Sequence, residues 1–127
     1  MRGYKARGTN FERTLVKLFW ENGFASLRVA GSGSAPLSLP DIIAIKKGRI
    51  IAIECKTCSN DSFYLKNKDI DQLDEFREVS GCEAYVAVKF QRIKPKVFPL
   101  DLIKGKKISK NDTSLALETL FGFQKTL

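Results

Sequence analysis

The sequence of 127 residues contains no histidine, and this absence excludes several kinds of active site. Serine–histidine and cysteine–histidine catalysis both need an imidazole base, and histidine-ligated zinc is equally impossible. Any acid–base chemistry in this chain must therefore rely on carboxylates and lysines.

Long apolar runs are missing as well. No stretch approaches the roughly 20 consecutive apolar residues of a membrane span, and no signal-peptide segment opens the chain. The cysteines, only three, are odd in number, which favours a reducing compartment. We expect a cytoplasmic protein with no membrane partner and no small-molecule cofactor.

Acidic residues are in the minority, because 14 Asp and Glu stand against 22 Lys and Arg, for a net charge of +8. The charges fall in blocks: eight basic residues and one acid lie between 89 and 110, whereas seven acids and three basic residues lie between 61 and 83. Such asymmetry predicts a basic face for phosphates and an acidic face turned away. The alternative is that excess lysine merely solubilises a small protein.

The length and the alternation of apolar patterns predict a single α/β domain spanning 1–127, with a mixed central β-sheet flanked by helices. Residues 1–8 are predicted to form a flexible basic arm, and 31–40 a loop rich in Gly, Ser and Pro. The predicted elements are a helix over 10–21, strands over 24–30, 41–46 and 49–56, a helix over 69–79 capped by Asp69, a strand over 82–90, an edge strand over 97–103, and a helix from 113 or 114 to 121.

The strands 41–46 and 49–56 are predicted to form a hairpin around Lys47-Gly48. In that register Asp41 faces Glu54, and directly opposed side chains have Cβ atoms about 4.5–5.5 Å apart. Lys56 lies on the same face as Glu54, because side chains alternate along a strand. Two acids and a lysine thus converge at one end of an otherwise apolar hairpin.

Two carboxylates this close repel each other unless a positive group lies between them, and a divalent cation would relieve the repulsion. Such a cation could polarise a phosphodiester while Lys56 orients the attacking water. The alternative is a solvated Asp41 beside an ordinary ion pair of Glu54 with Lys56.

Glu12 is a third candidate acid, because it shares an inward-facing helical stripe with Leu15 and Phe19. A shared metal site would give this carboxylate a partner. The alternative is a capping box, in which Glu12 reaches back to the amide of Thr9.

Pro40-Asp41, twelve further residues and then Glu54-Cys55-Lys56 form the pattern PD-(D/E)xK. The chain therefore resembles the restriction-endonuclease-like nuclease superfamily. Further stretches resemble one branch of it, the archaeal Holliday-junction resolvases. These stretches are Phe11-Glu12-Arg13, Arg28-Val-Ala-Gly-Ser32, Ala87-Val-Lys-Phe90 and the C-terminal Gly-Phe-Gln-Lys-Thr-Leu127.

This resemblance implies a homodimer, associated with the nucleoid, that binds four-way DNA junctions and cuts two opposed strands with Mg²⁺ or Mn²⁺. It implies that Glu12, Asp41 and Glu54 bind the metal with the backbone carbonyl of Cys55. It assigns catalytic roles to the same three acids, to Lys56 and to the loop residue Ser32, with Ser34 and Ser38 as alternatives in the same loop. The predicted DNA-binding residues are Arg2, Lys5, Arg7, Arg13, Arg28, Ser34, Lys89, Arg92 and Lys94.

Two other functions stay open: another PD-(D/E)xK repair or restriction nuclease acting on duplex DNA, and a non-catalytic nucleic-acid-binding module. The apolar C-terminal region is a candidate part of the dimer interface, and Phe76 is another candidate. The candidates in that region are Leu115, Leu117, Leu120, Phe121 and Phe123. The alternative for all of them is packing onto the subunit's own sheet.

The net charge generates a first prediction. If about 6–10 basic side chains contact phosphates, junction affinity should fall about 10³–10⁵-fold between 50 and 200 mM salt. Fluorescence anisotropy with a labelled four-way junction measures this directly. A flat salt response would contradict a polyanionic partner.

Overall fold

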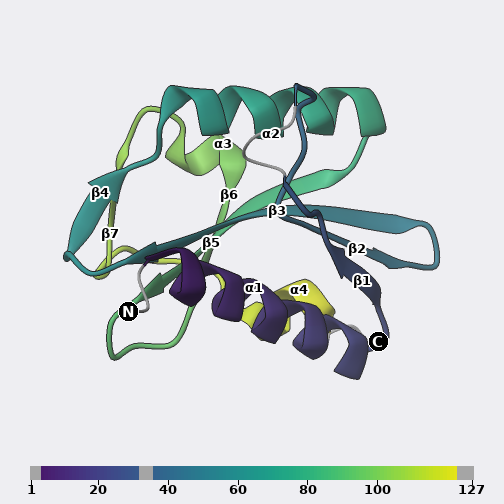
Figure 1. Cartoon of the computed structure of the whole chain (residues 1–127), viewed down its shortest axis with the longest axis horizontal. Helices are drawn as coiled ribbons and strands as arrows, with labels where there is room; N and C mark the ends of the chain where they lie inside the picture. Colours follow the sequence, from purple (N-terminus) through teal and green to yellow (C-terminus); the bar gives the residue numbers. More distant parts are fainter. Residues whose placement is uncertain (1–3, 32–35, 123–127) are drawn as a thin grey trace.

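The computed structural model describes residues 4–31 and 36–122, with side chains described from Gly8 onward. It contains one five-stranded sheet and one two-stranded sheet, with helices on both faces of the larger sheet (Figure 1). The elements are α1 (Tyr4–Glu21), β1 (Ala25–Arg28), β2 (Ile42–Lys46), β3 (Arg49–Cys58), β4 (Ser62–Tyr64), α2 (Asn67–Ser80), β5 (Glu83–Phe90), β6 (Lys96–Pro99), α3 (Leu100–Ile103), β7 (Lys107–Ser109) and α4 (Leu117–Phe121).

The larger sheet has the strand order β1-β2-β3-β5-β6 and is mixed, as predicted. Strands β1, β2 and β3 are antiparallel neighbours, whereas β3 and β5 are parallel and joined by a crossover through α2. The carboxyl ends of β3 and β5 therefore lie side by side. Strand β6 forms the edge, and β4 pairs with β7 in the separate small sheet.

The β2–β3 hairpin has the predicted register, since Ile43 pairs with Ala52 and Ile45 with Ile50. Lys47 and Gly48 have φ values of 47° and 87°. Positive φ at both central residues defines a type I′ turn, whose twist matches the twist of the flanking strands. The turn and the apolar alternation together fix which residues share a face.

A hydrophobic core lies on each face of the large sheet. Under α1 and α4, the ring of Phe19 packs edge-on against Phe24 and Phe121, with ring centroids 5.1 and 5.2 Å apart. Under α2 and α3, Leu73 and Ile103 pack against β5. On the α1 side lie Ile51 and Ile53, so alternation places Glu54 and Lys56 on the α2 side.

The C-terminal helix packs mainly onto its own subunit. Leu120 and Phe121 are 1% and 6% exposed and belong to the core beneath α1. Phe76 is partly buried against the core beneath α2, while Leu115 and Leu117 pack against the α1 core. The expectation that Leu120 and Phe121 contribute to a dimer interface is therefore wrong, and Phe123 lies outside the described residues.

Two expectations about the N-terminus are also wrong. Helix α1 already includes Tyr4, so residues 4–8 are helical rather than a flexible arm. The buried Phe11 and Leu15 anchor this helix on the core. Thr9 consequently lies inside the helix, which excludes the proposed capping box with Glu12.

Three other boundaries differ from the prediction. The α2 helix has Lys66 as its N-cap, so Asp69 lies inside the first turn. The segment 97–103 is a strand only as far as Pro99, which cannot donate to a ladder, and continues as α3. The last helix begins at Leu117 because Leu115 first exchanges two backbone hydrogen bonds with Val97.

The small sheet of β4 and β7 was not predicted, and β1 is shorter than the predicted strand over 24–30. Both β4 and β7 have three residues, too few for an alternation pattern to be recognised. None of the helices in the described part of the chain has the length and apolar character needed to cross a lipid bilayer.

Candidate active site

Asp41 directly precedes Ile42, the first residue of strand β2, and lies beside β3 at the open end of the hairpin. Its N–H donates to Ile53 O at 3.0 Å. If the register of the hairpin continued, Asp41 would pair with Glu54, so Asp41 is offset from that register by one residue. Its carboxylate Oδ2 accepts the N–H of Cys55 at 2.8 Å. The Asp41 side chain thus lies against the backbone of β3.

The backbone carbonyl of Cys55 lies on the same side of β3 as Asp41. In a strand, the N–H and C=O of one residue project toward the same neighbouring strand. Because the N–H of Cys55 meets the Asp41 carboxylate, its carbonyl oxygen also points toward the side of β2. The geometry is therefore compatible with the expectation that this carbonyl is a metal ligand.

Glu54 and Lys56 lie together on the α2 side of β3. Lys56 Nζ is 3.6 Å from Glu54 Oε2 and 2.8 Å from Oδ2 of Asp69, a residue of the first turn of α2. The Glu54 side chain is only 13% exposed, and that of Lys56 is 30% exposed. The lysine therefore bridges strand and helix rather than pairing with Glu54 alone.

Glu12 approaches from the opposite side of the sheet. It projects from α1, and its Oε1 accepts a hydrogen bond from Nε of Arg28 at 3.0 Å. Burial raises the pKa of Glu12, the hydrogen bond from Arg28 opposes this shift, and the charge of Asp41 adds to it. Asp41 therefore interacts electrostatically with Glu12 on one side and with Glu54 on the other.

Glu54 has the most perturbed carboxyl group of the site. Burial raises its pKa to about 8, and the negative charge of Asp41 contributes to the same shift. For Lys56, burial lowers the pKa, but the hydrogen bond to Asp69 and the charge of Glu54 outweigh it, and the net pKa is raised. Burial likewise raises the pKa of the Cys55 thiol well above its usual range, so this side chain is not a reactive thiolate.

The oxygen-rich donor set suits a hard divalent cation. Asp41, Glu54 and the Cys55 carbonyl supply only oxygens, and Mg²⁺ typically takes one or two carboxylates together with water and substrate phosphate. Across 4–31 and 36–122, no three acidic or cysteine side chains converge closely enough to chelate an ion, since Glu12 is turned to Arg28. The fit therefore rests on two carboxylates, and Glu12 would need to leave Arg28 to join them.

The predicted DNA-binding residues have several different environments. Arg13 is exposed on α1, and Arg92 and Lys94 are exposed in the turn that follows β5. Arg28 is paired with Glu12, and Lys89 Nζ donates to the carbonyls of Phe90 and Ile93. Lys89 of β5 pairs with Thr57 of β3 in the parallel ladder. The turn after β5, which contains Arg92 and Lys94, therefore lies near the carboxyl end of the strand that carries Glu54 and Lys56.

The remaining predicted residues are mostly outside the description. Ser32 and Ser34 lie outside the described residues, as do Arg2 and the side chains of Lys5 and Arg7. Ser38 is described, and its hydroxyl hydrogen-bonds to a carboxylate oxygen of Glu75 on α2.

The expected separation of an acidic face from a basic face is only partly correct. Lys104 Nζ lies 2.7 Å from Asp74, and Lys110 Nζ lies 3.0 Å from Asp61. Both pairs join the basic block to the acidic block, because α3 and β7 pack beside α2 and β4. The basic residues that remain outside these pairs include Arg92 and Lys94.

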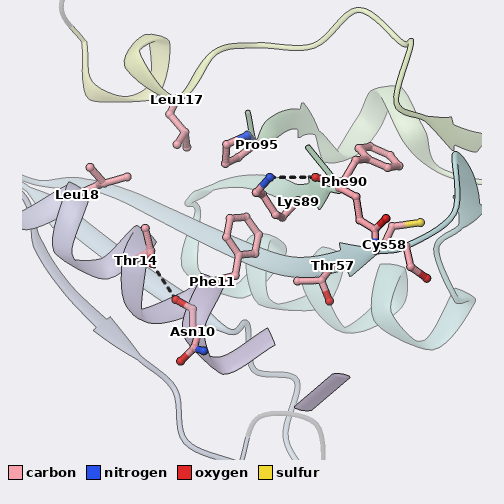
Figure 2. Close-up of a pocket in the computed structure, with 12 residues that line it drawn as sticks. Asn10, Phe11, Thr14, Leu18, Thr57, Cys58, Lys89, Phe90, Pro95 and Leu117 are labelled. Atoms are coloured by element: carbon pink, nitrogen blue, oxygen red, sulfur yellow. Dashed lines mark hydrogen bonds between the residues drawn. The ribbon is translucent and has the colours of Figure 1, made fainter. Parts of the chain in front are cut away.

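A cavity of about 530 Å³ contains none of the candidate acids. It lies on the α1 side, where Phe11 and Leu18 of α1 face Thr57, Phe90, Pro95 and Leu117 (Figure 2). The figure also shows Lys89 at this cavity, hydrogen-bonded to the carbonyl of Phe90. The candidate acids Asp41 and Glu54 therefore lie outside this cavity.

The fold is restriction-endonuclease-like. The solved structure of Archaeoglobus fulgidus Hjc, a Holliday junction resolvase from an archaeal hyperthermophile, matches with a TM-score of 0.81 and 36% identity, covering 90% of this chain and 98% of that one. The bacterial homing endonuclease I-Ssp6803I matches with a TM-score of 0.58 over 88% of this chain and 80% of its own. At 13% identity the second match shows the fold alone.

Sequence comparison identifies the family. A model described as archaeal Holliday junction resolvase (Hjc) matches residues 3–127. The crossover junction endodeoxyribonuclease Hjc of Archaeoglobus fulgidus is 41% identical over 118 residues, which cover 90% of this chain and 87% of the relative. The crossover junction endodeoxyribonuclease Hje of Sulfolobus acidocaldarius is 37% identical over 114 residues, which cover 87% and 81%. The chain belongs to the archaeal Holliday junction resolvase family.

The raised pKa of Glu54 generates a prediction about stability. The folded protein holds a proton that the unfolded chain releases between about pH 4.5 and pH 8. Without divalent cations, the free energy of unfolding should therefore fall by a few kcal/mol as the pH rises through this interval. In Glu54→Gln the fall should be largely absent, and Mg²⁺ should recover stability at pH 8 in the unmutated protein only.

Urea denaturation at several pH values, in EDTA and in Mg²⁺, provides the measurement. A parallel pH dependence in the unmutated protein and in Glu54→Gln would show that another group dominates. Glu78→Gln, which removes an exposed carboxylate from α2, is the matched control.

Proposed function

We propose that this protein is a metal-dependent endonuclease that resolves four-way DNA junctions by paired, symmetric hydrolysis of two phosphodiester bonds. The observation that carries the proposal is the placement of Asp41 and Glu54 at the end of the β2–β3 hairpin with Lys56 beside them. The names of the relatives, which are crossover junction endodeoxyribonucleases, support the choice of substrate.

The carboxylates of Asp41 and Glu54 and the Cys55 carbonyl would hold Mg²⁺, with Mn²⁺ as a substitute. When bound, the cation would supply a Lewis acid for the scissile phosphate and lower the pKa of an attacking water. Glu54 is largely buried and favours its protonated form, so binding a cation there exchanges a proton for the metal. Glu12 is a further ligand only if it releases Arg28.

Lys56 would orient the attacking water or stabilise the charge that develops on the phosphate. Its ammonium lies 3.6 Å from Glu54, and the side chain as a whole is 30% exposed, which would leave it accessible to DNA. The ion pairs also raise its pKa, which keeps it cationic at neutral pH. A permanent positive charge suits electrostatic stabilisation better than proton abstraction.

The basic residues Arg13, Arg92 and Lys94 would contact phosphates without regard to sequence, which suits recognition of DNA shape at a branch point. Arg28 has a second possible role, because DNA could draw it away from Glu12. That exchange would free Glu12 for the cation, and it would couple DNA binding to completion of the metal site.

Substitution of the carboxylates tests the proposed activity. Asp41→Asn and Glu54→Gln should abolish junction cutting, by at least 10³-fold, because each removes an anionic ligand. Junction affinity should be unchanged or slightly higher, since a negative charge facing phosphate is removed. Single-turnover cleavage in Mg²⁺ and anisotropy in EDTA measure the two quantities.

A panel of four-way, flap, nicked and linear duplex DNAs separates this function from other nucleases of the fold. The proposal expects two symmetric cuts in the four-way junction and little cutting of linear duplex. Preferential cutting of linear duplex would contradict junction resolution, and binding without metal-dependent cutting would indicate a non-catalytic module.

A homodimer completes the proposal, because two symmetric cuts need two sites related by a two-fold axis. The outer face of β1 and β2 supplies an uncovered apolar strip, which we define as Ala25, Leu27, Ile43 and Ile45. Leu27 and Ile45 are 51% and 41% exposed, and Leu27 pairs with Ile43 across the strands. Helix α2 packs against β3 and β5, and Leu27 and Ile45 are exposed, so we propose that a second copy packs against this strip.

The strip generates a prediction about assembly. Leu27→Glu should convert the dimer to a monomer, because an isologous contact would place the new charge on both sides of the apolar interface. Sedimentation velocity measures the change. Leu102→Glu is the matched control, since Leu102 is 63% exposed on α3 and lies outside the strip. A Leu27→Glu variant that remains dimeric would contradict this interface.

A further inference from the structure

The ammonium group of Lys56 is bound more closely by an acid of α2 than by the neighbouring acid of its own strand. Its Nζ is 2.8 Å from Oδ2 of Asp69 and 3.6 Å from Oε2 of Glu54. Asp69 is 19% exposed, so this ion pair is shielded from solvent on much of its surface. The PD-(D/E)xK pattern contains Glu54 and Lys56 but does not include Asp69.

Asp69 has no evident duty as a helix cap. The N-cap of α2 is Lys66, with no side-chain capping bond, and Ile70 N–H bonds to the Lys66 carbonyl. The carboxylate of Asp69 instead projects back across the sheet face to β3. Asp69 lies in the first turn of α2, where the partial positive charge of the helix N-terminus attracts negatively charged side chains.

The two acids beside Lys56 differ in what else they would do. Under the proposed function Glu54 shares its charge with a cation, which weakens its attraction for the lysine and adds a repulsive neighbour. Asp69 lies on α2, outside the donor set formed by Asp41, Glu54 and Cys55. It therefore retains its full charge for Lys56 when the donor set is occupied.

We propose that Asp69 is the positioning residue for Lys56. Its ion pair holds the ammonium at the reaction centre despite the conformational freedom of the long side chain and the electrostatic repulsion of a bound cation. This inference rests on the proposed nuclease function. Lysine has four flexible side-chain bonds, and fixing it costs entropy that a hydrogen-bonded ion pair offsets. Misplacing a group at a reaction centre by about 1 Å can reduce a rate about 10²-fold.

The first test measures the ion pair without any catalysis. Acetic anhydride labelling followed by mass spectrometry should show Lys56 modified several-fold faster in Asp69→Asn than in the unmutated protein, because the ammonium is released from its closest acceptor. Lys17, which is exposed on α1, should be labelled equally in both. Equal labelling of Lys56 in both proteins would overturn the inference.

The second test compares single-turnover cleavage of a four-way junction in Mg²⁺. Asp69→Asn should cut about 10–100-fold more slowly, with junction Kd in EDTA and melting temperature close to those of the unmutated protein. Asp71→Asn, an exposed acid two residues along α2, changes the net charge identically and should cut normally. Asp69→Glu should restore part of the rate, since it returns the charge with a longer arm.

A double-mutant comparison separates positioning from a structural role. If Asp69 acts through Lys56, Asp69→Asn should slow cleavage little further in a Lys56→Ala background. Equal losses in both backgrounds, or normal cutting by Asp69→Asn, would overturn the inference while leaving the nuclease function intact. Failure of both the unmutated protein and Asp71→Asn to cut junctions would instead reject the proposed function, and the labelling result would still decide whether Asp69 holds Lys56.

Discussion

The candidate site depends on one unfavourable arrangement, the enclosure of two acids at the end of a hairpin. Asp41 directly precedes β2, and its carboxylate accepts the N–H of Cys55 on β3. Glu54 lies on β3 with a side chain only 13% exposed. Like charges in a poorly solvated place destabilise each other, and burial with the neighbouring charge raises the pKa of Glu54 to about 8. Under the proposed function, a divalent cation bound between the two acids would remove this cost.

The surrounding structure organises the charges around those two acids. Arg28 holds Glu12 on the α1 side, and Asp69 holds Lys56 on the α2 side. Asp41, directly before β2, interacts electrostatically with both Glu12 and Lys56. Side chains from opposite faces of the sheet thereby surround Asp41, and under the proposed function they would contribute to one reaction centre.

Much of this could be predicted from the sequence because strands impose a strict rule. The Lys47-Gly48 turn and the alternation of Ile and Ala determined the hairpin register, and with it the approach of position 41 to position 54. The departure of Asp41 from that register was not predictable. It depends on two long-range backbone hydrogen bonds, in which the Asp41 N–H donates to Ile53 and the Asp41 carbonyl accepts from Val29. The partners Arg28 and Asp69 were missed as partners because both ion pairs join residues that are far apart in sequence. The only signal for Asp69 was an acid in a first helical turn, which suggested a cap.

The most direct test of the proposed metal site uses crystals soaked in Mn²⁺ and measured at a wavelength where manganese scatters anomalously. We expect one strong anomalous peak within coordination distance of the Asp41 and Glu54 carboxylates and the Cys55 carbonyl. The peak should disappear in Asp41→Asn crystals treated identically. Absence of a peak at this position in the unmutated protein, with Lys56 still bound to Glu54 and Asp69, would contradict cation binding by the two carboxylates.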